Sequence, residues 1–238
     1  MSKPCVGIIV QARLGSTRLP KKVLLDLTDG KSILAYLVQR LSTCHSADKV
    51  IVATTENTDD DFLVNFLEKN GYSYFRGSEP DCLDRFYKTA KTFGLDIIVR
   101  ITSDCPLIVP DIIDDMIDYY LKNEKYLDYL SNRQFTNFPE GLDTEIFNAR
   151  MLEDAAMNAD SADEREHINY YFLRRDNTYR IRYYNHNYGY DYSRFKLSID
   201  TINDYKRIFS FFNEKGLPES FKFPELIKVL TADEKQNV

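Results

Sequence analysis

The sequence predicts an α/β protein built on a mostly parallel β-sheet with helices on both faces. Short β-branched runs alternate with segments whose apolar residues recur at helical spacing, and this alternation is typical of βαβ units. The chain has 238 residues, enough to bury a sizeable core in one large domain. The alternation breaks near Asp128. We therefore expect a single domain, 1–238, in which residues of about 125–195 form an inserted lobe.

Four strands and four helices alternate in the first half of the chain. β-Branched and apolar residues favour strands, and they gather in residues 6–10, 49–54, 72–75 and 96–101. Helical spacing of apolar residues predicts helices within residues 32–41, 58–70, 83–90 and 110–121. Ser32 is a suitable N-cap for the first helix, and Gly71 can end the second.

The second half is predicted to be less regular. Ser161 and Glu164 have the spacing of a capping box, which favours a helix start. The polar tail at 232–238 is expected to fray. We expect strands at residues 144–148, 179–185 and 195–199, and helices from residue 151, from Ser161 to Phe172, and at about 202–215 and 224–230.

The most informative segment follows the first strand and reads Q-A-R-L-G-S-T-R-L-P-K-K, residues 11–22. Gly15 permits close approach of the backbone to an anion, and the amide groups there can form an anion-binding nest. Arg13 and Arg18 offer bidentate donors for phosphate oxygens, and Ser16 adds a hydroxyl donor. A solvated basic turn is the commoner origin of such a composition. The position directly after a strand favours a polyphosphate-binding loop.

Two aspartates follow predicted strands, where parallel sheets present functional groups. Asp104 lies in T-S-D-C-P-L and Asp200 in L-S-I-D-T. Either one alone is better explained as the N-cap of the following helix. Because Mg²⁺ binds through one or two carboxylates together with phosphate oxygens, the pair beside a phosphate loop predicts a metal site.

Composition excludes several classes of protein. The formal charge of −6 argues against a general nucleic-acid surface, so the basic loop is interpreted as a local site. There is no apolar run near 18 residues and no signal-peptide pattern, and we expect no membrane partner. The four cysteines are scattered without a C-x-x-C pair. We expect them to be reduced in a cytoplasmic protein.

Three further polar groups lie in or near predicted loops and are weak signals individually. They are Arg76 to Ser78 with Arg85, the segment 141–145, and the segment 164–167. Arg85 could equally form a surface ion pair, and residues 164–166 could be a solvated helix face. His167 could be a structural histidine.

Seven motifs in order resemble one family. They read I-I-V-Q-A-R-L-G-S-T-R-L-P-x-K-V-L, V-I-V-A-T-T, F-R-G-S-E-x-D-x-L-D-R-F, V-R-I-T-x-D-C-P-L-I, E-G-L-D-T-E-I-F, E-R-E-H-I and S-I-D-T-x-x-D-Y. This set is similar to the spore-coat-polysaccharide cytidylyltransferases, relatives of the synthetases that make CMP-KDO, over about residues 6–212. The resemblance implies a nucleotide-diphospho-sugar transferase fold, a three-layer Rossmann-like sandwich with a substrate and dimer lobe. It also implies a homodimer, with CTP as nucleotide substrate and Mg²⁺ as cofactor.

The resemblance also implies roles for individual residues. Arg13, Lys22 and Asp104 would be catalytic, and Asp104 and Asp200 would hold the metal. The residues that would bind the nucleotide are Gln11, Ala12, Arg13, Gly15, Ser16, Arg18, Lys22, Ser78, Arg85 and Arg100. Those that would face the acceptor are Asp143, Glu145, Arg165 and His167.

Three positions depart from the family pattern. Lys21 and Ser103 stand where Gly is common, and Ile202-Asn203 stands where Pro-Glu is common. A lysine at position 21 is expected to stiffen the loop, and Ser103 to narrow the approach to the metal. No charged group of the predicted site is lost.

The implied reaction is transfer of CMP from CTP to a sugar acid or sugar phosphate, with release of pyrophosphate, in glycan biosynthesis. One alternative is a glycosyltransferase that uses a finished nucleotide sugar, which would need an Asp-x-Asp after a central strand. Residues 59–61 have this spacing, but they are typical of a helix N-terminus. The other alternative is a non-catalytic nucleotide-sugar-binding protein. The joint presence of five charged groups argues against it: Arg13, Arg18, Lys22, Asp104 and Asp200.

Overall fold

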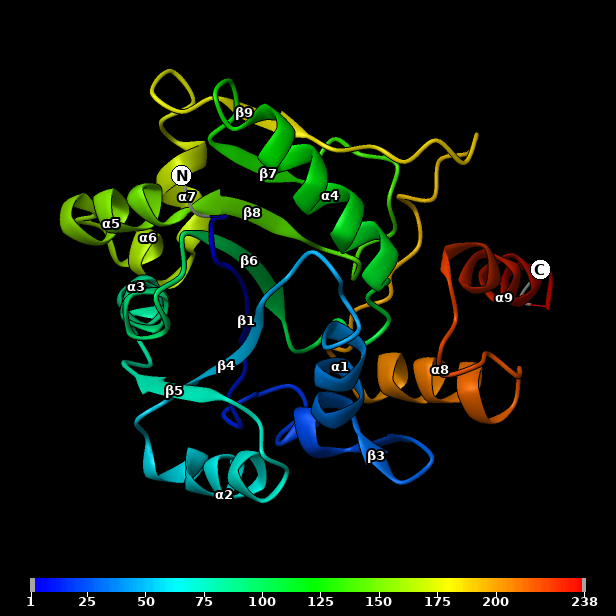
Figure 1. Cartoon of the computed structure of the whole chain (residues 1–238). Coiled ribbons are helices and arrows are strands. Elements are labelled where there is room, and N and C mark those ends of the chain that lie inside the picture. The colour runs from blue at the N-terminus through cyan, green and yellow to red at the C-terminus, as the bar shows by residue number, and fades with distance from the viewer. Residues whose placement is uncertain (1–2, 237–238) are drawn as a thin grey trace.

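The computed structural model describes residues 3–236, and its centre is a seven-stranded sheet (Figure 1). The strands of this sheet are β1 (Val6–Gln11), β4 (Lys49–Thr55), β5 (Tyr74–Gly77), β6 (Ile97–Thr102), β7 (Tyr129–Ser131), β8 (Glu145–Asn148) and β9 (Ile181–Tyr183). They are arranged in the order β5-β4-β1-β6-β8-β7-β9. All neighbours pair in parallel except β8, which is antiparallel to both β6 and β7. The predicted mostly parallel sheet is confirmed.

Helices cover both faces of the sheet (Figure 1). They are α1 (Ile33–Leu41), α2 (Asp61–Lys69), α3 (Cys82–Phe93), α4 (Pro110–Asn123), α5 (Ala149–Asn158), α6 (Ala162–Glu166), α7 (Ile168–Leu173), α8 (Ile202–Asn213) and α9 (Phe223–Gln236). Two 3₁₀ turns, η1 (Lys22–Leu24) and η2 (Thr58–Asp60), and a small hairpin of β2 (Asp26–Thr28) and β3 (Lys31–Ser32) lie outside this framework. Ser32 caps α1 as predicted, accepting a hydrogen bond from the Ala35 amide.

The core consists of two apolar layers separated by the sheet. Side chains on a strand alternate between its faces. Accordingly, Val6, Ile8 and Val10 pack toward α1, α4, α8 and α9, whereas Ile9 packs toward α3, α5 and α7. All four side chains are fully buried. This burial on both faces explains the unbroken apolar run of the first strand and confirms the three-layer architecture.

The structure differs from the sequence predictions in the second half. β7 and β9 join β8 in the central sheet, so the expected lobe 125–195 supplies three strands of the main sheet. No strand forms at 195–199, where the β-pairing is limited to an isolated bridge between Lys196 and the loop residue Glu140. The helix expected from Ser161 to Phe172 is interrupted at His167, whose φ of −111° and ψ of 88° are not helical.

The end of the chain also differs from the expected frayed tail at 232–238. α9 continues to Gln236, since no glycine or proline interrupts its last turns. Residues 237 and 238 lie outside the described part of the chain.

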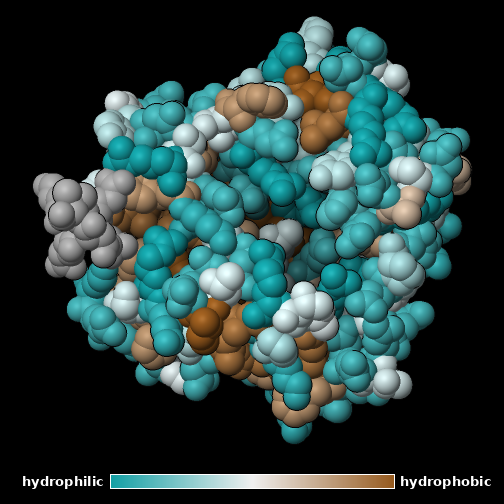
Figure 2. Space-filling model, turned by 180° about the vertical axis from the view of Figure 1, so that it is seen from behind, coloured by the Kyte–Doolittle hydropathy of each residue, from teal (hydrophilic) through white to brown (hydrophobic). Residues whose placement is uncertain are grey.

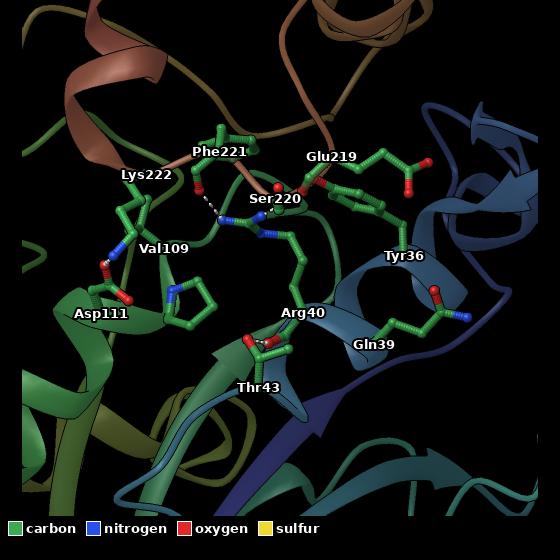
Figure 3. Close-up of a pocket in the computed structure, with 11 residues that line it drawn as sticks. Tyr36, Gln39, Arg40, Thr43, Val109, Asp111, Glu219, Ser220, Phe221 and Lys222 are labelled. Carbon is green, nitrogen blue, oxygen red and sulfur yellow. Dashed lines mark hydrogen bonds and ion pairs between the residues drawn. The ribbon is translucent and has the colours of Figure 1, made fainter.

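Arg40 fastens α1 to the segment between α8 and α9 (Figure 3). Its guanidinium donates to the carbonyls of Ile108, Glu219 and Phe221 and stacks on the Phe221 ring at 3.9 Å. Burial lowers the pKa of Arg40, against the influence of the Tyr36 hydroxyl. A cavity of about 240 Å³ lies beside this contact. Because the guanidinium is committed to three carbonyls, we assign it a structural role.

The extended segment that precedes Asp200 depends on Gly141. The Leu197 amide donates to the Glu140 carbonyl at 2.6 Å, and the Glu140 amide donates to the Phe195 carbonyl at 2.9 Å. Gly141 has a φ of +96°, and a Cβ there would lie 2.5 Å from the Ser198 amide nitrogen. Only glycine fits a backbone approach this close.

We predict that Gly141→Ala lowers the free energy of unfolding by more than about 2 kcal/mol, because a strained backbone at this φ costs roughly 1–3 kcal/mol and the methyl group also meets backbone atoms. Urea denaturation measures the change. Gly216→Ala is the matched control, since Gly216 also has a positive φ, +69°, but has open space around it. Equal losses in the two variants would contradict the steric argument.

Candidate active site

The candidate site lies where three parallel strands end. Gln11, the last residue of β1, pairs with Ala53 of β4 on one side and with Thr102 of β6 on the other. The loops that follow these strands therefore meet at one edge of the sheet. Seen from behind, the molecule is hollowed at its middle, and the surface around the hollow is largely hydrophilic (Figure 2).

The buried carboxylate of Asp60 anchors the backbone of the basic loop after β1. Asp60 accepts a hydrogen bond from the Leu14 amide at 2.7 Å and a second one from the Thr55 hydroxyl. Residues 59–61 thus begin a helix and anchor the loop. Lys21 has a left-handed backbone with a φ of 56°, the conformation that glycine adopts most easily. This conformation explains why glycine suits position 21 in the family pattern.

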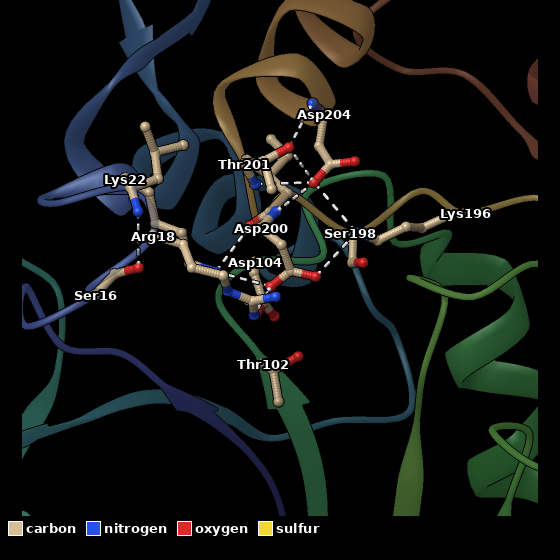
Figure 4. Close-up of polar contacts among 12 residues, drawn as sticks. Ser16, Arg18, Lys22, Thr102, Asp104, Lys196, Ser198, Asp200, Thr201 and Asp204 are labelled. Carbon is tan, nitrogen blue, oxygen red and sulfur yellow. Dashed lines mark hydrogen bonds and ion pairs between the residues drawn. The ribbon is translucent and has the colours of Figure 1, made fainter.

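Basic and acidic groups from distant parts of the chain line one cavity of about 290 Å³ (Figure 4). Its lining residues are Gln11, Arg13, Gly15, Ser16, Thr17, Arg18, Lys22, Thr102, Ser103, Asp104 and Asp200. The structure therefore brings the predicted phosphate loop and both predicted metal ligands together. Ala12, which also belongs to the loop, is buried and does not line this cavity.

Two cations of the loop are paired with the two aspartates. Lys22 Nζ lies 3.0 Å from Asp104 Oδ2 and 3.7 Å from Asp200 Oδ1. Arg18 donates to Asp200 Oδ1 at 2.7 Å. Burial would raise the pKa of Asp104, but Lys22 and a hydrogen bond from Thr102 hold it below its ordinary value. Asp104 is therefore ionised at neutral pH.

Tertiary contacts bring Asp200 to Asp104. The Ile199 amide donates to the Asp104 carbonyl at 2.8 Å, and Lys22 Nζ donates to the Ile199 carbonyl at 2.7 Å. Thr201 and Asp204 form the capping box of α8 directly after Asp200. Burial of Asp204 is outweighed by hydrogen bonds from Thr201 and Lys196, and its pKa falls to about 2.

The donor set of this cavity fits Mg²⁺. Lys22 Nζ contacts the carboxylates of both Asp104 and Asp200, so a cation at this position is within reach of an oxygen from each of them. Among residues 3–232, whose side chains the structure describes, no group of three or more acidic, histidine or cysteine side chains is arranged to hold a metal. The remaining ligands would come from phosphate oxygens and water, which is the usual coordination of Mg²⁺.

A second cavity of about 230 Å³ adjoins the first and shares Thr102, Asp104 and Asp200 with it. Three of the four predicted acceptor residues, Asp143, Glu145 and His167, line this second cavity. The interruption between α6 and α7 puts His167 there. Its other lining residues are Arg100, Cys105, Arg133, Glu140 and Ser198.

Arg100 and Glu145 form a buried ion pair in the wall of the second cavity. They are direct partners in the antiparallel register of β6 and β8. The Tyr129 hydroxyl also donates to Glu145. Burial would raise the pKa of Glu145, but Arg100 and Tyr129 hold it below its ordinary value. Arg100 was expected to bind the nucleotide, and its other contact is with Gln11 Oε1 at 3.3 Å.

Asp143 differs from the other carboxyls of the site. Its burial raises its pKa to about 7, with Arg133 opposing the shift and Glu145, Glu140 and Asp104 adding to it. Arg133 Nε is 3.8 Å from Asp143 Oδ2, too far for a strong compensating hydrogen bond. Asp143 can therefore change protonation near neutral pH.

Besides Ala12, three predicted residues lie outside both cavities. Arg85 is buried and donates to the carbonyls of Ser78 and Glu79. The Ser78 hydroxyl accepts from the Asp81 amide at 3.2 Å. Arg165 donates to the Ala159 carbonyl at 2.9 Å and contacts Asp81 at 3.4 Å. All three hold local structure around the turn after β5 and the start of α6.

The sequence analysis missed three groups near the site. Arg133 and Glu140 line the second cavity but lie in segments without a recognisable spacing. Lys196 contacts Asp200 at 3.0 Å, and its place four residues before Asp200 was the available signal. None of the helices between residues 3 and 236 has the length and apolar character that crossing a membrane requires.

Comparisons with known proteins agree on one family. Residues 7–235 match the model of the family described as cytidylyltransferase. The spore coat polysaccharide biosynthesis protein SpsF of Bacillus subtilis is 32% identical over 93% of this chain and 92% of its own length. A cytidylyltransferase structure from Leptospira borgpetersenii is 38% identical, covers 98% of this chain and 96% of that one, and has a TM-score of 0.91.

A more distant structure confirms the predicted fold type. CMP:2-keto-3-deoxy-manno-octonic acid synthetase, in complex with CTP, has a TM-score of 0.69 at 15% identity, over 89% of this chain and 99% of that one. The shared architecture is the nucleotide-diphospho-sugar transferase fold, and the family resemblance read from the sequence is confirmed.

We predict that Asp143→Asn is more stable than the wild type above pH 7, by up to about 4 kcal/mol, and equally stable below about pH 4. A carboxyl with a raised pKa keeps its proton in the folded state after the unfolded chain has lost it, so wild-type stability falls between these values. Urea denaturation at pH 4, 6 and 8 measures this difference. A constant difference across pH, or the same trend in the exposed control Asp59→Asn, would contradict it.

Proposed function

Because the chain belongs to the cytidylyltransferase family, and is therefore a nucleotidyltransferase enzyme, we propose that it transfers CMP from CTP to a sugar acid or sugar phosphate with Mg²⁺ as cofactor. Pyrophosphate is released, and the product serves the biosynthesis of a surface polysaccharide or glycan. The observation that carries the proposal is the meeting of three cations of the loop with two carboxylates in one cavity. The similarity to SpsF and to the Leptospira cytidylyltransferase supports it.

The two adjoining cavities suggest how the substrates are arranged. The first has Arg13, Arg18 and Lys22 for the triphosphate, and the second has the groups suited to the acceptor. Asp104 and Asp200 lie between them, where the α-phosphate would meet the attacking oxygen. Catalysis then consists mainly of positioning and charge neutralisation, since phosphoryl-type transfer needs little covalent help.

In the proposed reaction, an acceptor oxygen attacks the α-phosphorus and the bond to the β-phosphate oxygen breaks. Arg13, Arg18 and Lys22 neutralise the leaving pyrophosphate. Asp143, with its pKa near 7, is suited to accept the proton of an attacking hydroxyl. Mg²⁺ held by Asp104 and Asp200 would neutralise phosphate charge and polarise the attacked group.

The acceptor-side cavity supports an acidic sugar as acceptor. Arg100 is buried and paired with Glu145, whereas Arg133 is 43% exposed and only loosely paired with Asp143. Arg133 is thus suited to bind the carboxylate or phosphate of the acceptor. Glu140, Asp143 and His167 can accept hydrogen bonds from sugar hydroxyls or donate hydrogen bonds to them.

We predict that Asp104→Asn and Asp200→Asn each lower pyrophosphate release from CTP and Mg²⁺ by about a hundredfold or more, the usual loss for one preorganised electrostatic group. A coupled pyrophosphate assay with a panel of sugar acids and sugar phosphates measures the rate. Asp115→Asn on α4 is the control, because this carboxyl is exposed and outside the site. Wild-type turnover in both site variants would overturn the metal assignment.

The alternative functions predict a different binding pattern. A glycosyltransferase or a nucleotide-sugar sensor would be stabilised by a finished CMP-sugar and not by free CTP. We expect CTP with Mg²⁺ to raise the melting temperature more than a CMP-sugar does, because the basic loop offers more cations than a monophosphate needs. We expect it to exceed UTP and GTP as well, because the family is one of cytidylyltransferases. Differential scanning fluorimetry compares the four ligands, and a shift confined to the CMP-sugar would reject the proposal.

We also propose a cytoplasmic homodimer, as the family resemblance implies, with 125–195 as the acceptor-side and dimerisation region. The four cysteines are free thiols, which suits a reducing compartment. Sedimentation equilibrium would reject the dimer if the protein stays monomeric at micromolar concentration.

A further inference from the structure

Glu79 touches the basic loop although it lines neither cavity. Its Oε1 accepts a hydrogen bond from Arg13 NH1 at 2.9 Å, and its Oε2 accepts one from the Asn57 side chain. The carboxylate also lies against the loop backbone, since a Cβ built on Gly15 would be 3.6 Å from Glu79 Oε1. The Glu79 carboxylate thus lies against the part of the loop that is suited to bind an anion.

The turn that carries Glu79 is fixed in place. Arg85, buried beneath it, donates to the carbonyls of Ser78 and Glu79. The Asn57 side of the contact is fixed too, because Arg76 donates to the Asn57 carbonyl at 3.0 Å. Residues that the sequence predicted at the nucleotide therefore hold this carboxylate in position.

Arg13 cannot donate the same hydrogen bonds to Glu79 and to a phosphate chain at once. Its guanidinium offers one planar fork of donors, and a carboxylate and a phosphate oxygen compete for the same donors. Both side chains of this pair are partly exposed, 42% and 33%, so the contact is open to exchange. The pairing of Lys22 and Arg18 with Asp104 and Asp200 follows the same pattern at the other end of the loop.

We propose that Glu79 is a positioning residue that holds Arg13 in the empty site and is displaced from it by the triphosphate of the nucleotide. This inference rests on the proposed function, which supplies the triphosphate. Glu79 keeps the guanidinium extended over Gly15 and compensates its charge until the substrate arrives. The exchange weakens nucleotide binding and leaves the chemical step unchanged.

The test is Glu79→Gln, which keeps the shape of the side chain and its amide partner but removes the charge. We expect the dissociation constant of CTP with Mg²⁺, measured by isothermal titration calorimetry, to fall about two- to fivefold, the range that a partly exposed ion pair supports. The KM for CTP falls by the same factor, whereas kcat stays within about twofold.

Two further variants separate competition from other effects. Glu56→Gln removes an equally negative, exposed side chain from the loop after β4, and it controls for general electrostatics. In an Arg13→Met background the competition no longer exists, so Glu79→Gln should bring no gain in affinity. A merely structural role of Glu79 would change affinity in both backgrounds.

Inorganic tripolyphosphate is the second probe, because it contains the phosphate chain without the nucleoside. The same gain with tripolyphosphate supports displacement by phosphate. A loss of CTP affinity in Glu79→Gln, or a gain equal to that of Glu56→Gln, overturns the inference while leaving the proposed function intact. Failure of the wild type to bind both CTP and tripolyphosphate would overturn the proposed function itself.

Discussion

The site depends on the pairing of its own cations with its own carboxylates. Arg13 contacts Glu79, Lys22 bridges Asp104 and Asp200, and Arg18 also binds Asp200. Several uncompensated positive charges on one short loop would repel each other and oppose folding. The internal pairs remove this repulsion while no substrate is bound. In the proposed function, a metal-bound polyphosphate would offer replacements of both signs, so that binding would exchange partners.

This electrostatic arrangement needs a rigid scaffold, because the paired groups come from segments far apart in the chain. The loops after β1 and β6 lie side by side since their strands are neighbours in register. Asp200 arrives on an extended segment that is tied to Asp104 by the Ile199 amide and is closely packed on Gly141. The fold thereby places the carboxylates of Asp104 and Asp200 within contact distance of the Lys22 ammonium group, although no single sequence motif contains both aspartates.

The second cavity contains one tightly held ion pair and one loosely held pair of charged side chains. Arg100 and Glu145 are neighbours across β6 and β8, so the register of the sheet sets their pairing and Tyr129 completes it. Such a buried network is held by the fold and resists change. Asp143 and Arg133 are only loosely paired beside it. This difference supports a structural role for the network and the proposed role of the loose pair in substrate recognition.

Local sequence determined the class of the fold and the chemistry of one loop. Alternating apolar runs, the Ser32 cap and the composition of residues 11–22 express rules that act over a few residues, and the structure agrees with all three. Only tertiary structure decided that 195–199 is extended without a strand partner, that His167 interrupts a helix, and that Arg85 lies beneath Glu79 rather than in a cavity. The reason is physical: each of these outcomes depends on a contact with a distant or out-of-register segment, and the energy of that contact is absent from any local pattern.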